Sequence, residues 1–328
     1  MISDDPQYYI DGVLDQNRQI LAKTITLIES SLPSHQELGG KVLDQLLSHT
    51  GKGIRLGVTG IPGAGKSTFI ESLGSRLIEK GHRVAVLAVD PSSSRSGGSI
   101  LADKTRMERL STEEGAYIRP SPSGGTLGGV ARKTRETMLV CEAAGFDVAI
   151  VETVGVGQSE TTVSSMVDFF LVLMISGAGD ELQGIKKGVL ELADAVAINK
   201  ADGNNIKKAE IAKKEYENAL HLLNPASPTW TTPVLTCSAI EMTGVDEIWS
   251  NILLHKKKMV ESGEFEDKRK KQALEWMWSL LEEGLKERFF MHPEIKKILP
   301  GVVRSVEKGL SSPSAAVNKF LFVLDKGL

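Results

Sequence analysis

The chain has 328 residues, of which 41% are hydrophobic and 25% are charged, the composition of an ordinary globular protein. Its 39 Lys and Arg residues and 42 Asp and Glu residues give a net charge of −3, which argues against nucleic acid as the main partner. No apolar run reaches the ~18 residues of a membrane-spanning helix, and the acidic start resembles neither a secretion signal nor a transit peptide, so we expect a cytoplasmic protein that does not bind membranes.

Residues 1–50 carry apolar side chains at helical spacing, first over Ile20–Ile28 and then over Val42–Leu47. Between these two stretches, Pro33 and the pair Gly39–Gly40 interrupt the pattern over residues 31–40. We therefore predict that a helical hairpin or a short helical bundle forms an N-terminal extension.

Short apolar runs alternate with amphipathic stretches from residue 51 to residue 262. Continuous apolar runs suit strands that are buried on both faces of a parallel sheet. Their alternation with helices predicts a mostly parallel, doubly wound α/β domain. The expected strands cover residues 55–60, 83–89, 147–152, 168–175, 194–199 and 233–237. The expected helices cover residues 65–80, 128–144, 180–192, 204–222 and 244–262.

The strand pattern stops after residue 262. Leu274–Phe289 carries an apolar stripe at helical spacing, and further short helices are expected, with breaks at Pro300–Gly301 and Ser311–Pro313. We predict a helical C-terminal region over residues 263–328. The periodicity leaves open whether the stripe is buried against the chain's own core or pairs with a second copy.

The stretch GIPGAGKST at residues 60–68 matches the phosphate-binding pattern G-x-x-x-x-G-K-[ST], at the point where a strand ends and an amphipathic helix begins. Glycines let the backbone wrap a phosphate, and the helix N-terminus presents unpaired N–H groups to it. Lys66 is expected to contact the β- and γ-phosphates and Ser67 to bind Mg²⁺. These features predict a P-loop NTPase. The phosphate-binding residues are predicted to be Gly60, Gly63, Ala64, Gly65, Lys66, Ser67 and Thr68.

The stretch NKAD at residues 199–202 ends a later strand. Asp202 can accept hydrogen bonds from the N1–H and amino groups of guanine, which adenine does not offer, and a site built on such bonds rejects the analogue that lacks them. Asn199 and Lys200 complete this motif. Ser238 and Ala239, just past the last strand, fall where a second base-contacting loop belongs. GTP is therefore the expected nucleotide.

Three acidic residues are candidates for a magnesium site beside the P-loop. Glu152 ends a strand where the usual GTPase pattern D-x-x-G has an aspartate, and Gly155 would let its N–H approach the γ-phosphate. Asp90 ends another strand, and Asp103 lies beyond a Gly/Ser-rich stretch. Mg²⁺ prefers such a mixture of carboxylates, phosphates and water. The metal candidates are Ser67, Asp90, Asp103 and Glu152, and the catalytic candidates are Lys66, Glu152 and Asp90.

Five segments in this order, GIPGAGKST, VDPSSSRSGGSILADKTRM, ETVGVGQSE, SGAGDELQGIKKG and NKAD, together resemble one family. It comprises P-loop GTPases that serve as chaperones for adenosylcobalamin-dependent acyl-CoA mutases, above all methylmalonyl-CoA mutase. Its members are also called ATPases of lysine/arginine/ornithine transport. The resemblance runs over residues 50–262, and the flanking helices suit it at both ends.

The resemblance implies roles for residues that lie in the matching segments. Lys66 and Ser67 would act on phosphate and Mg²⁺, and Asn199, Lys200 and Asp202 would read guanine. The glycine-rich loop at residues 176–188 resembles the switch that communicates nucleotide state to the mutase. Its switch candidates are Gln183 and Lys186, and the residues that would surround the metal are Asp90, Asp103 and Glu152.

The resemblance also implies partners. GTP hydrolysis would control the loading of intact adenosylcobalamin onto the mutase and the protection of that enzyme, and the C-terminal helices would form a homodimer. No D-x-H-x-x-G stretch, the pattern of base-off cobalamin binding, occurs in the sequence, so the cobalamin is expected to belong to the partner.

Three other readings remain open. A metal-insertion GTPase usually carries a histidine-rich tract or a Cys/His cluster, whereas the six histidines here are scattered. An ATP-dependent kinase or transport accessory is disfavoured by Asp202, which prefers guanine. The protein could also bind and report nucleotide with negligible turnover alone, because no general base is identifiable. We therefore expect slow intrinsic hydrolysis that a partner accelerates.

Overall fold

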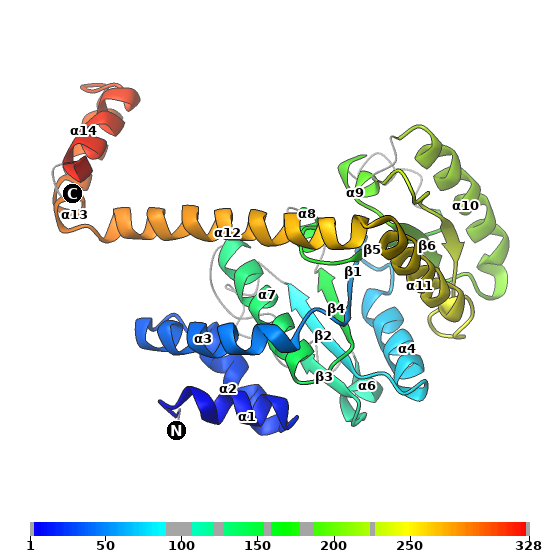
Figure 1. Cartoon of the computed structure of the whole chain (residues 1–328). Helices are drawn as coiled ribbons and strands as arrows, with labels where there is room; N and C mark the ends of the chain where they lie inside the picture. Colours follow the sequence, from blue (N-terminus) through cyan, green and yellow to red (C-terminus); the bar gives the residue numbers. More distant parts are fainter. Residues whose placement is uncertain are drawn as a thin grey trace. The chain divides into compact units, whose positions relative to one another are not determined.

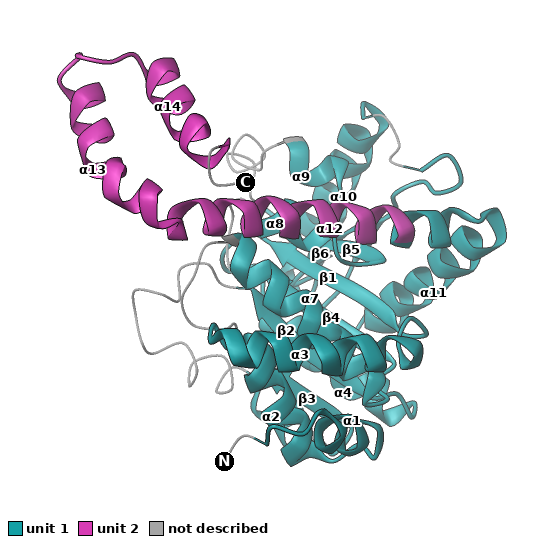
Figure 2. Ribbon diagram, turned by 60° about the vertical axis from the view of Figure 1, so that its left-hand side comes forward, with its two compact units in different colours: residues 1–269 teal, residues 270–328 magenta. Residues whose placement is uncertain are grey.

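The computed structural model describes residues 3–89, 107–120, 127–153, 159–177, 187–223 and 227–325. The chain divides into two compact units, residues 1–269 and residues 270–328 (Figure 2). The first unit contains a seven-stranded sheet with the order β3-β2-β4-β1-β5-β6-β7, in which every neighbouring pair is parallel. This confirms the predicted doubly wound α/β fold with helical extensions. The strands are β1 (Ile54–Gly60), β2 (Val84–Val89), β3 (Ala116–Arg119), β4 (Val148–Thr153), β5 (Phe169–Ile175), β6 (Ala195–Asn199) and β7 (Val234–Thr236).

Helices cover both faces of the sheet (Figure 1). The connection from β1 to β2 and the connection from β3 to β4 run in opposite directions across the sheet. Right-handed crossovers therefore place their helices, α4 and α7, on opposite faces. On the α4 face, α4 contacts α6 and α11, and on the other face α7 contacts α8. These helices are α4 (Lys66–Glu79), α6 (Glu108–Thr112), α7 (Leu127–Ala143), α8 (Ser159–Ser164), α9 (Lys187–Glu191), α10 (Ile206–His221) and α11 (Val245–Ser262).

The strand β3 and the short helices α6 and α8 were not predicted from the sequence. β3 has four residues, only two of them buried, and it forms an edge of the sheet beside β2. Its apolar run ends at Ile118, before Arg119, and is shorter than the runs of about four to eight residues that signal a strand. The pairing of Val84 with Ala116 establishes it as a strand.

The N-terminal extension consists of α1 (Pro6–Leu14), α2 (Arg18–Glu29) and α3 (Pro33–Leu46), which contact one another and α7. The predicted break over residues 31–40 is wrong in its extent. The chain breaks only before Pro33, which occupies the first turn of α3, where proline is tolerated. The helix then continues through the glycine pair, with Gly39 buried in ordinary contact with Ile28 of α2.

The second unit is helical. It contains the larger part of α12 (Glu264–Met291), α13 (Pro293–Glu307) and α14 (Pro313–Asp325). The predicted break at Pro300 is wrong, since α13 continues through it. Its amphipathic face, with Ile295 and Val302 buried, and its contact with α14 outweigh the lost hydrogen bond. In the part of the chain that the structure describes, none of the helices has the length and hydropathy of a bilayer-spanning segment.

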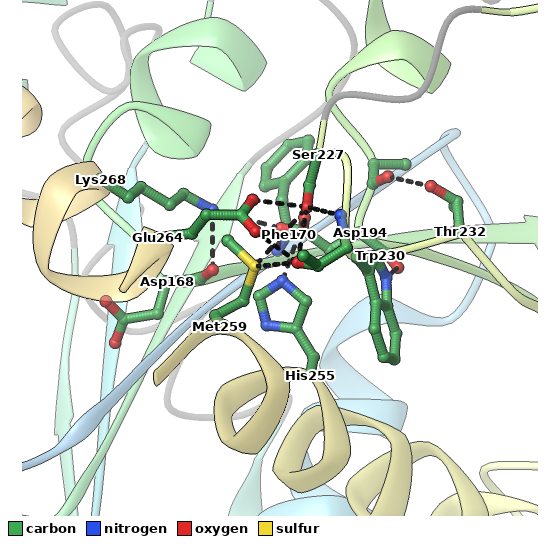
Figure 3. A network of polar contacts seen from close by, with 12 residues as sticks. Asp168, Phe170, Asp194, Ser227, Trp230, Thr232, His255, Met259, Glu264 and Lys268 are labelled. Carbon is green, nitrogen blue, oxygen red and sulfur yellow. Dashed lines mark hydrogen bonds and ion pairs between the residues drawn. The ribbon is translucent and has the colours of Figure 1, made fainter. Parts of the chain in front are cut away.

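A network of polar contacts lies at the amino ends of β5 and β6 (Figure 3). Asp168, at the start of β5, is buried and accepts hydrogen bonds from Arg269 Nε at 2.8 Å and Arg269 Nη2 at 2.7 Å. Asp194, at the start of β6, accepts from the main-chain N–H of Phe170 at 2.8 Å. Lys268 donates to the carbonyl of Asp168 at 2.7 Å. The first six residues of α12 are thus fastened to the edge of the sheet where the strands begin.

His255 of α11 lies within this network and is buried. Its ring stands edge-on to the rings of Phe169 and Trp230, with centroids 5.0 and 4.9 Å away. Its Nε2 is 3.6 Å from Asp194 Oδ1, too long for a hydrogen bond. Burial lowers the pKa of His255; Lys268 lowers it further, whereas Asp194, Asp168 and Glu264 oppose the shift. The folded protein therefore favours the neutral imidazole.

This environment predicts a pH dependence of stability. The folded state lowers the pKa of His255. The contribution of the neutral, buried His255 to the free energy of unfolding is therefore fully present above the pKa of the unfolded state, about 6.5, and is lost as the pH falls towards the lower pKa of the folded state. Urea unfolding of the full-length protein between pH 5 and pH 8 should show this loss. The free energy of unfolding should fall by up to about 1.4 kcal/mol for each unit by which the pH is lowered. His255→Gln should flatten the curve, and His221→Gln, at an exposed position on α10, should not. A curve unchanged by His255→Gln would contradict the assignment.

Candidate functional site

The loop between β1 and α4 has a shape that requires glycine at two positions. At Gly60, where β1 ends, an added Cβ would lie 2.1 Å from the carbonyl oxygen of Leu173 on β5. Gly65 has φ +85° and caps the N-terminus of α4, and a Cβ there would lie 2.8 Å from Asn199 Nδ2. At these two positions the backbone lies too close to its neighbours for a side chain, and the loop leads directly into the N-terminus of α4. Such a loop at a helix N-terminus is an anion site.

Two side chains beside this loop have the chemistry of phosphate and metal binding. Lys66 Nζ donates to the carbonyl oxygens of Gly60 at 2.8 Å and Ile61 at 3.4 Å, so its ammonium group folds back over the loop. Ser67 Oγ donates to Glu152 Oε1 at 3.0 Å. Glu152 is buried at the end of β4. The hydroxyl and the carboxylate that were predicted to share a metal are thus adjacent.

The other predicted residues of the phosphate loop are described as well. Thr68 lies in the first turn of α4 and is exposed, Ala64 is buried within the loop, and Gly63 is exposed. The remaining candidates, Asp90, Asp103, Gly155, Gln183 and Lys186, lie outside the described residues.

Asn199, at the end of β6, joins the P-loop to the loop that follows β7. Its side chain is buried. Asn199 Nδ2 donates to the carbonyl of Ala64 at 2.8 Å, and Asn199 Oδ1 accepts from the main-chain N–H of Ala239 at 3.1 Å. The phosphate side and the predicted base side of the site are therefore connected through one amide group.

Asp202 and Ser238 face each other at the base side. Ser238 Oγ donates to Asp202 Oδ2 at 2.6 Å and accepts from the main-chain N–H of Glu241 at 3.1 Å. The Ser238 N–H donates to the Thr243 carbonyl at 2.9 Å and closes the loop 238–243. These bonds hold the Asp202 carboxylate in one orientation, as a group that must accept two parallel hydrogen bonds requires.

Asn205 is a contributor that the sequence did not reveal. Its Nδ2 donates to the carbonyl of Lys200 at 2.6 Å, and its Oδ1 accepts from Ser176 Oγ at 2.7 Å. Lys200 has φ +61°, a left-handed conformation that is costly for a side chain other than glycine. Asn205 therefore supports this strained turn and ties it to the start of the loop at residues 176–188. No sequence motif includes an Asn at this position, six residues after Asn199, so the sequence alone could not indicate its role.

The described site residues lie at one edge of the sheet, where β1, β4 and β6 end. Ligands of open α/β sheets bind at this carboxyl edge. One end of the site offers N–H groups and a lysine to phosphate, and the other offers a fixed carboxylate to a base with two adjacent N–H donors. Guanine has such donors and adenine does not. The arrangement therefore suits a guanine nucleotide.

Comparison with known proteins agrees with this geometry. The sequence model of the family described as "Methylmalonyl Co-A mutase-associated GTPase MeaB" matches residues 21–294. The chain belongs to this family. As a MeaB-family protein it is a GTPase, and guanine nucleotide binding follows.

Relatives of the chain cover nearly its whole length. A putative GTPase of Caulobacter vibrioides is 55% identical over 93% of both chains, and the GTPase ArgK of Escherichia coli is 49% identical over 92% of this chain and 91% of its own. A mouse protein named "Methylmalonic aciduria type A homolog, mitochondrial" is 45% identical over 98% of this chain and 80% of its own. The crystal structure of a LAO/AO transport system kinase is similar, with a TM-score of 0.78, 41% identity and coverage of 98% and 97%.

The base-reading role of Asp202 can be tested by exchanging the nucleotide. Asp202→Asn should weaken GDP binding about a hundredfold, because two hydrogen bonds to a charged acceptor, each about 1.5 kcal/mol or more, are lost. The variant should gain affinity for xanthosine diphosphate, whose C2 carbonyl can accept from the new amide. Titration calorimetry with both nucleotides measures the exchange. Asp44→Asn, on the exposed surface of α3, is the matched control, and an unchanged GDP affinity of Asp202→Asn would refute the assignment.

Proposed function

We propose that this MeaB-family GTPase is a cytoplasmic chaperone of an adenosylcobalamin-dependent acyl-CoA mutase, methylmalonyl-CoA mutase or a related enzyme. It would control the loading of intact adenosylcobalamin onto the mutase and protect it. The family name, mutase-associated GTPase, and the name of the mouse relative support this proposal. The observation that carries it is the pair of hydrogen bonds by which Asn199 joins the P-loop to the loop 238–243, called here the base loop. Such a connection suits a site that senses which nucleotide is bound.

In this proposal GTP occupies the site with its phosphates on residues 60–68 and its base against the loops after β6 and β7. Lys66 would leave the carbonyl oxygens of Gly60 and Ile61 to contact the β- and γ-phosphates. Asp202 would accept from guanine, with Asn199, Lys200, Ser238 and Ala239 shaping the pocket. Gly155, together with Gln183 and Lys186 in the switch loop, would report the state of the γ-phosphate.

Mg²⁺ is proposed as the metal of the site. Ser67 Oγ and Glu152 Oε1 are 3.0 Å apart and supply the oxygen donors that this ion prefers. Asp90 and Asp103 would complete the set. When bound, the ion would neutralise charge on the phosphates.

The same residues suggest why turnover alone should be slow. Around the described part of the site, the side chains position and neutralise phosphate, and Glu152 is already engaged by Ser67. Phosphoryl transfer needs such positioning together with a group that orients water, and a partner protein can supply that group. The mutase is the partner we propose for this step.

A cognate adenosylcobalamin-dependent mutase should therefore accelerate GTP hydrolysis. We expect phosphate release at saturating GTP to rise at least tenfold on adding the mutase, since completing a phosphoryl-transfer site in trans is worth about 10³–10⁵ in rate for other GTPases. Lys66→Ala should abolish hydrolysis in both conditions. Equal rates with and without the mutase, and no recovery of a mutase from extract with the GTPase in either nucleotide state, would reject the proposal.

We also propose that the protein forms a homodimer through its C-terminal helices. Within the second unit, α12 exposes Leu274, Trp278 and Leu281 along one face, each about half accessible to solvent. Neighbouring apolar side chains continue this stripe at helical spacing. An exposed apolar stripe of this kind marks an interaction surface. The stripe comprises Leu274, Met277, Trp278, Leu281 and Leu285.

The dimer can be tested by placing a charge in the stripe. Leu281→Glu should convert the dimer to a monomer in light scattering, because a carboxylate would have to be buried without a partner. Glu283→Lys changes charge on the opposite side of the same helix and should leave the mass unchanged. A wild-type mass of one chain at micromolar concentration would refute the dimer.

A further inference from the structure

One face of the P-loop helix carries a polar stripe that the nucleotide does not use. Ser72, Arg76 and Lys80 follow one another at intervals of four residues, so they lie on one side of α4 and its C-terminal end. This side faces the loop 238–243 and the first turn of α11 (Figure 1). The stripe therefore connects the helix that begins at the phosphates with the segment that would contact the base.

Ser72 makes the contact of this stripe with the loop 238–243 itself. Its Oγ donates to the carbonyl oxygen of Ala239 at 2.6 Å. Ala239 is buried, and its N–H already donates to Asn199 Oδ1. Both main-chain polar groups of Ala239 are thus held by side chains. Because water has little access to this carbonyl, no solvent molecule readily replaces the Ser72 hydroxyl.

We infer that Ser72 is a positioning residue that holds the loop 238–243 closed on the P-loop helix and thereby sets the residence time of the guanine nucleotide. The inference rests on the proposed base-contacting role of Ser238 and Ala239. A base seated against Asp202 leaves when this loop moves away from it. That movement breaks the Ser72–Ala239 hydrogen bond together with the bond from Ala239 to Asn199.

The ion pairs of the stripe contribute less to holding the loop 238–243 against α4. Arg76 Nη2 lies 3.1 Å from Asp246 Oδ2, and Lys80 Nζ lies 2.5 Å from Asp246 Oδ1. All three side chains are between 41% and 47% exposed, so water and salt screen these pairs. They align the first turn of α11 with α4. The half-buried hydroxyl of Ser72, in contrast, contacts the loop 238–243 directly.

The loop itself is strained in a way that favours opening. Met242 has φ +60°, which a side chain other than glycine rarely adopts. The Ser238–Thr243 bridge holds the loop in this shape. A strained loop persists only where its surroundings hold it, and the Ser72 hydrogen bond is one of those restraints.

The test is the dissociation of a fluorescent GDP analogue from the full-length protein after mixing with excess unlabelled GTP. Ser72→Ala removes only the hydroxyl and should speed release about threefold to tenfold, the equivalent of one lost hydrogen bond. The rate of hydrolysis at saturating GTP should stay unchanged, because the phosphate contacts are intact. Ser75→Ala is the matched control, since Ser75 is half-buried on the same helix and lies outside the stripe.

A double variant separates positioning from general destabilisation. In an Asp202→Asn background the base is no longer held, so Ser72→Ala should add little to the rate of GDP release. The inference is overturned if Ser72→Ala releases GDP at the wild-type rate, if Ser75→Ala is equally fast, or if the effect of Ser72→Ala is undiminished by Asp202→Asn. The proposed site itself fails on a different result, an Asp202→Asn single variant that keeps wild-type GDP affinity.

Discussion

The buried amide of Asn199 is the contact on which the architecture of the nucleotide site depends. Its nitrogen holds the P-loop at Ala64 and its oxygen holds the base loop at Ala239. Removing either half would leave a buried main-chain group without its partner, at a cost of about 1–3 kcal/mol. The glycine at position 65 belongs to the same contact, because a side chain there would push the amide away. The conformations of the P-loop and of the base loop therefore depend on each other through the Asn199 side chain.

The two edges of the sheet have different tasks. The carboxyl edge carries glycine turns, and Lys200 there has a left-handed backbone conformation. The Lys66 ammonium group donates to main-chain carbonyl oxygens that a phosphate could replace as its partner. The amino edge carries Asp168 and Asp194, whose carboxylates are paired with main-chain N–H groups and with Arg269 and Lys268. Removing one partner of such a buried pair costs about 3–5 kcal/mol. These pairs fasten the starts of the strands at the amino edge, and the residues of the nucleotide site lie at the opposite edge.

The sequence predicted the features that are written in contiguous residues. The P-loop, NKAD and six strands could be recognised because each is a local pattern, and the strands begin and end within two residues of the expected positions. Ser72 and Asn205 were missed because their partners, Ala239 and Lys200, are defined only by the fold. Gly39 and Pro300 misled the prediction because tertiary packing overrides local preference. The roles of Asp90, Asp103, Gly155, Gln183 and Lys186 remain predictions.

The position of β1 has a consequence for how the protein is made. This strand is central, yet its neighbours are β4 and β5, which start at Val148 and Phe169. During synthesis the P-loop is therefore among the first parts of the sheet to leave the ribosome, and its supporting strands follow about a hundred residues later. Because non-local pairing is slow and Asn199 and Asp202 are held by Ala239 and Ser238, the nucleotide site is complete only after the loop 238–243 has emerged. GTP can thus act as a late ligand that favours the completed domain over its intermediates.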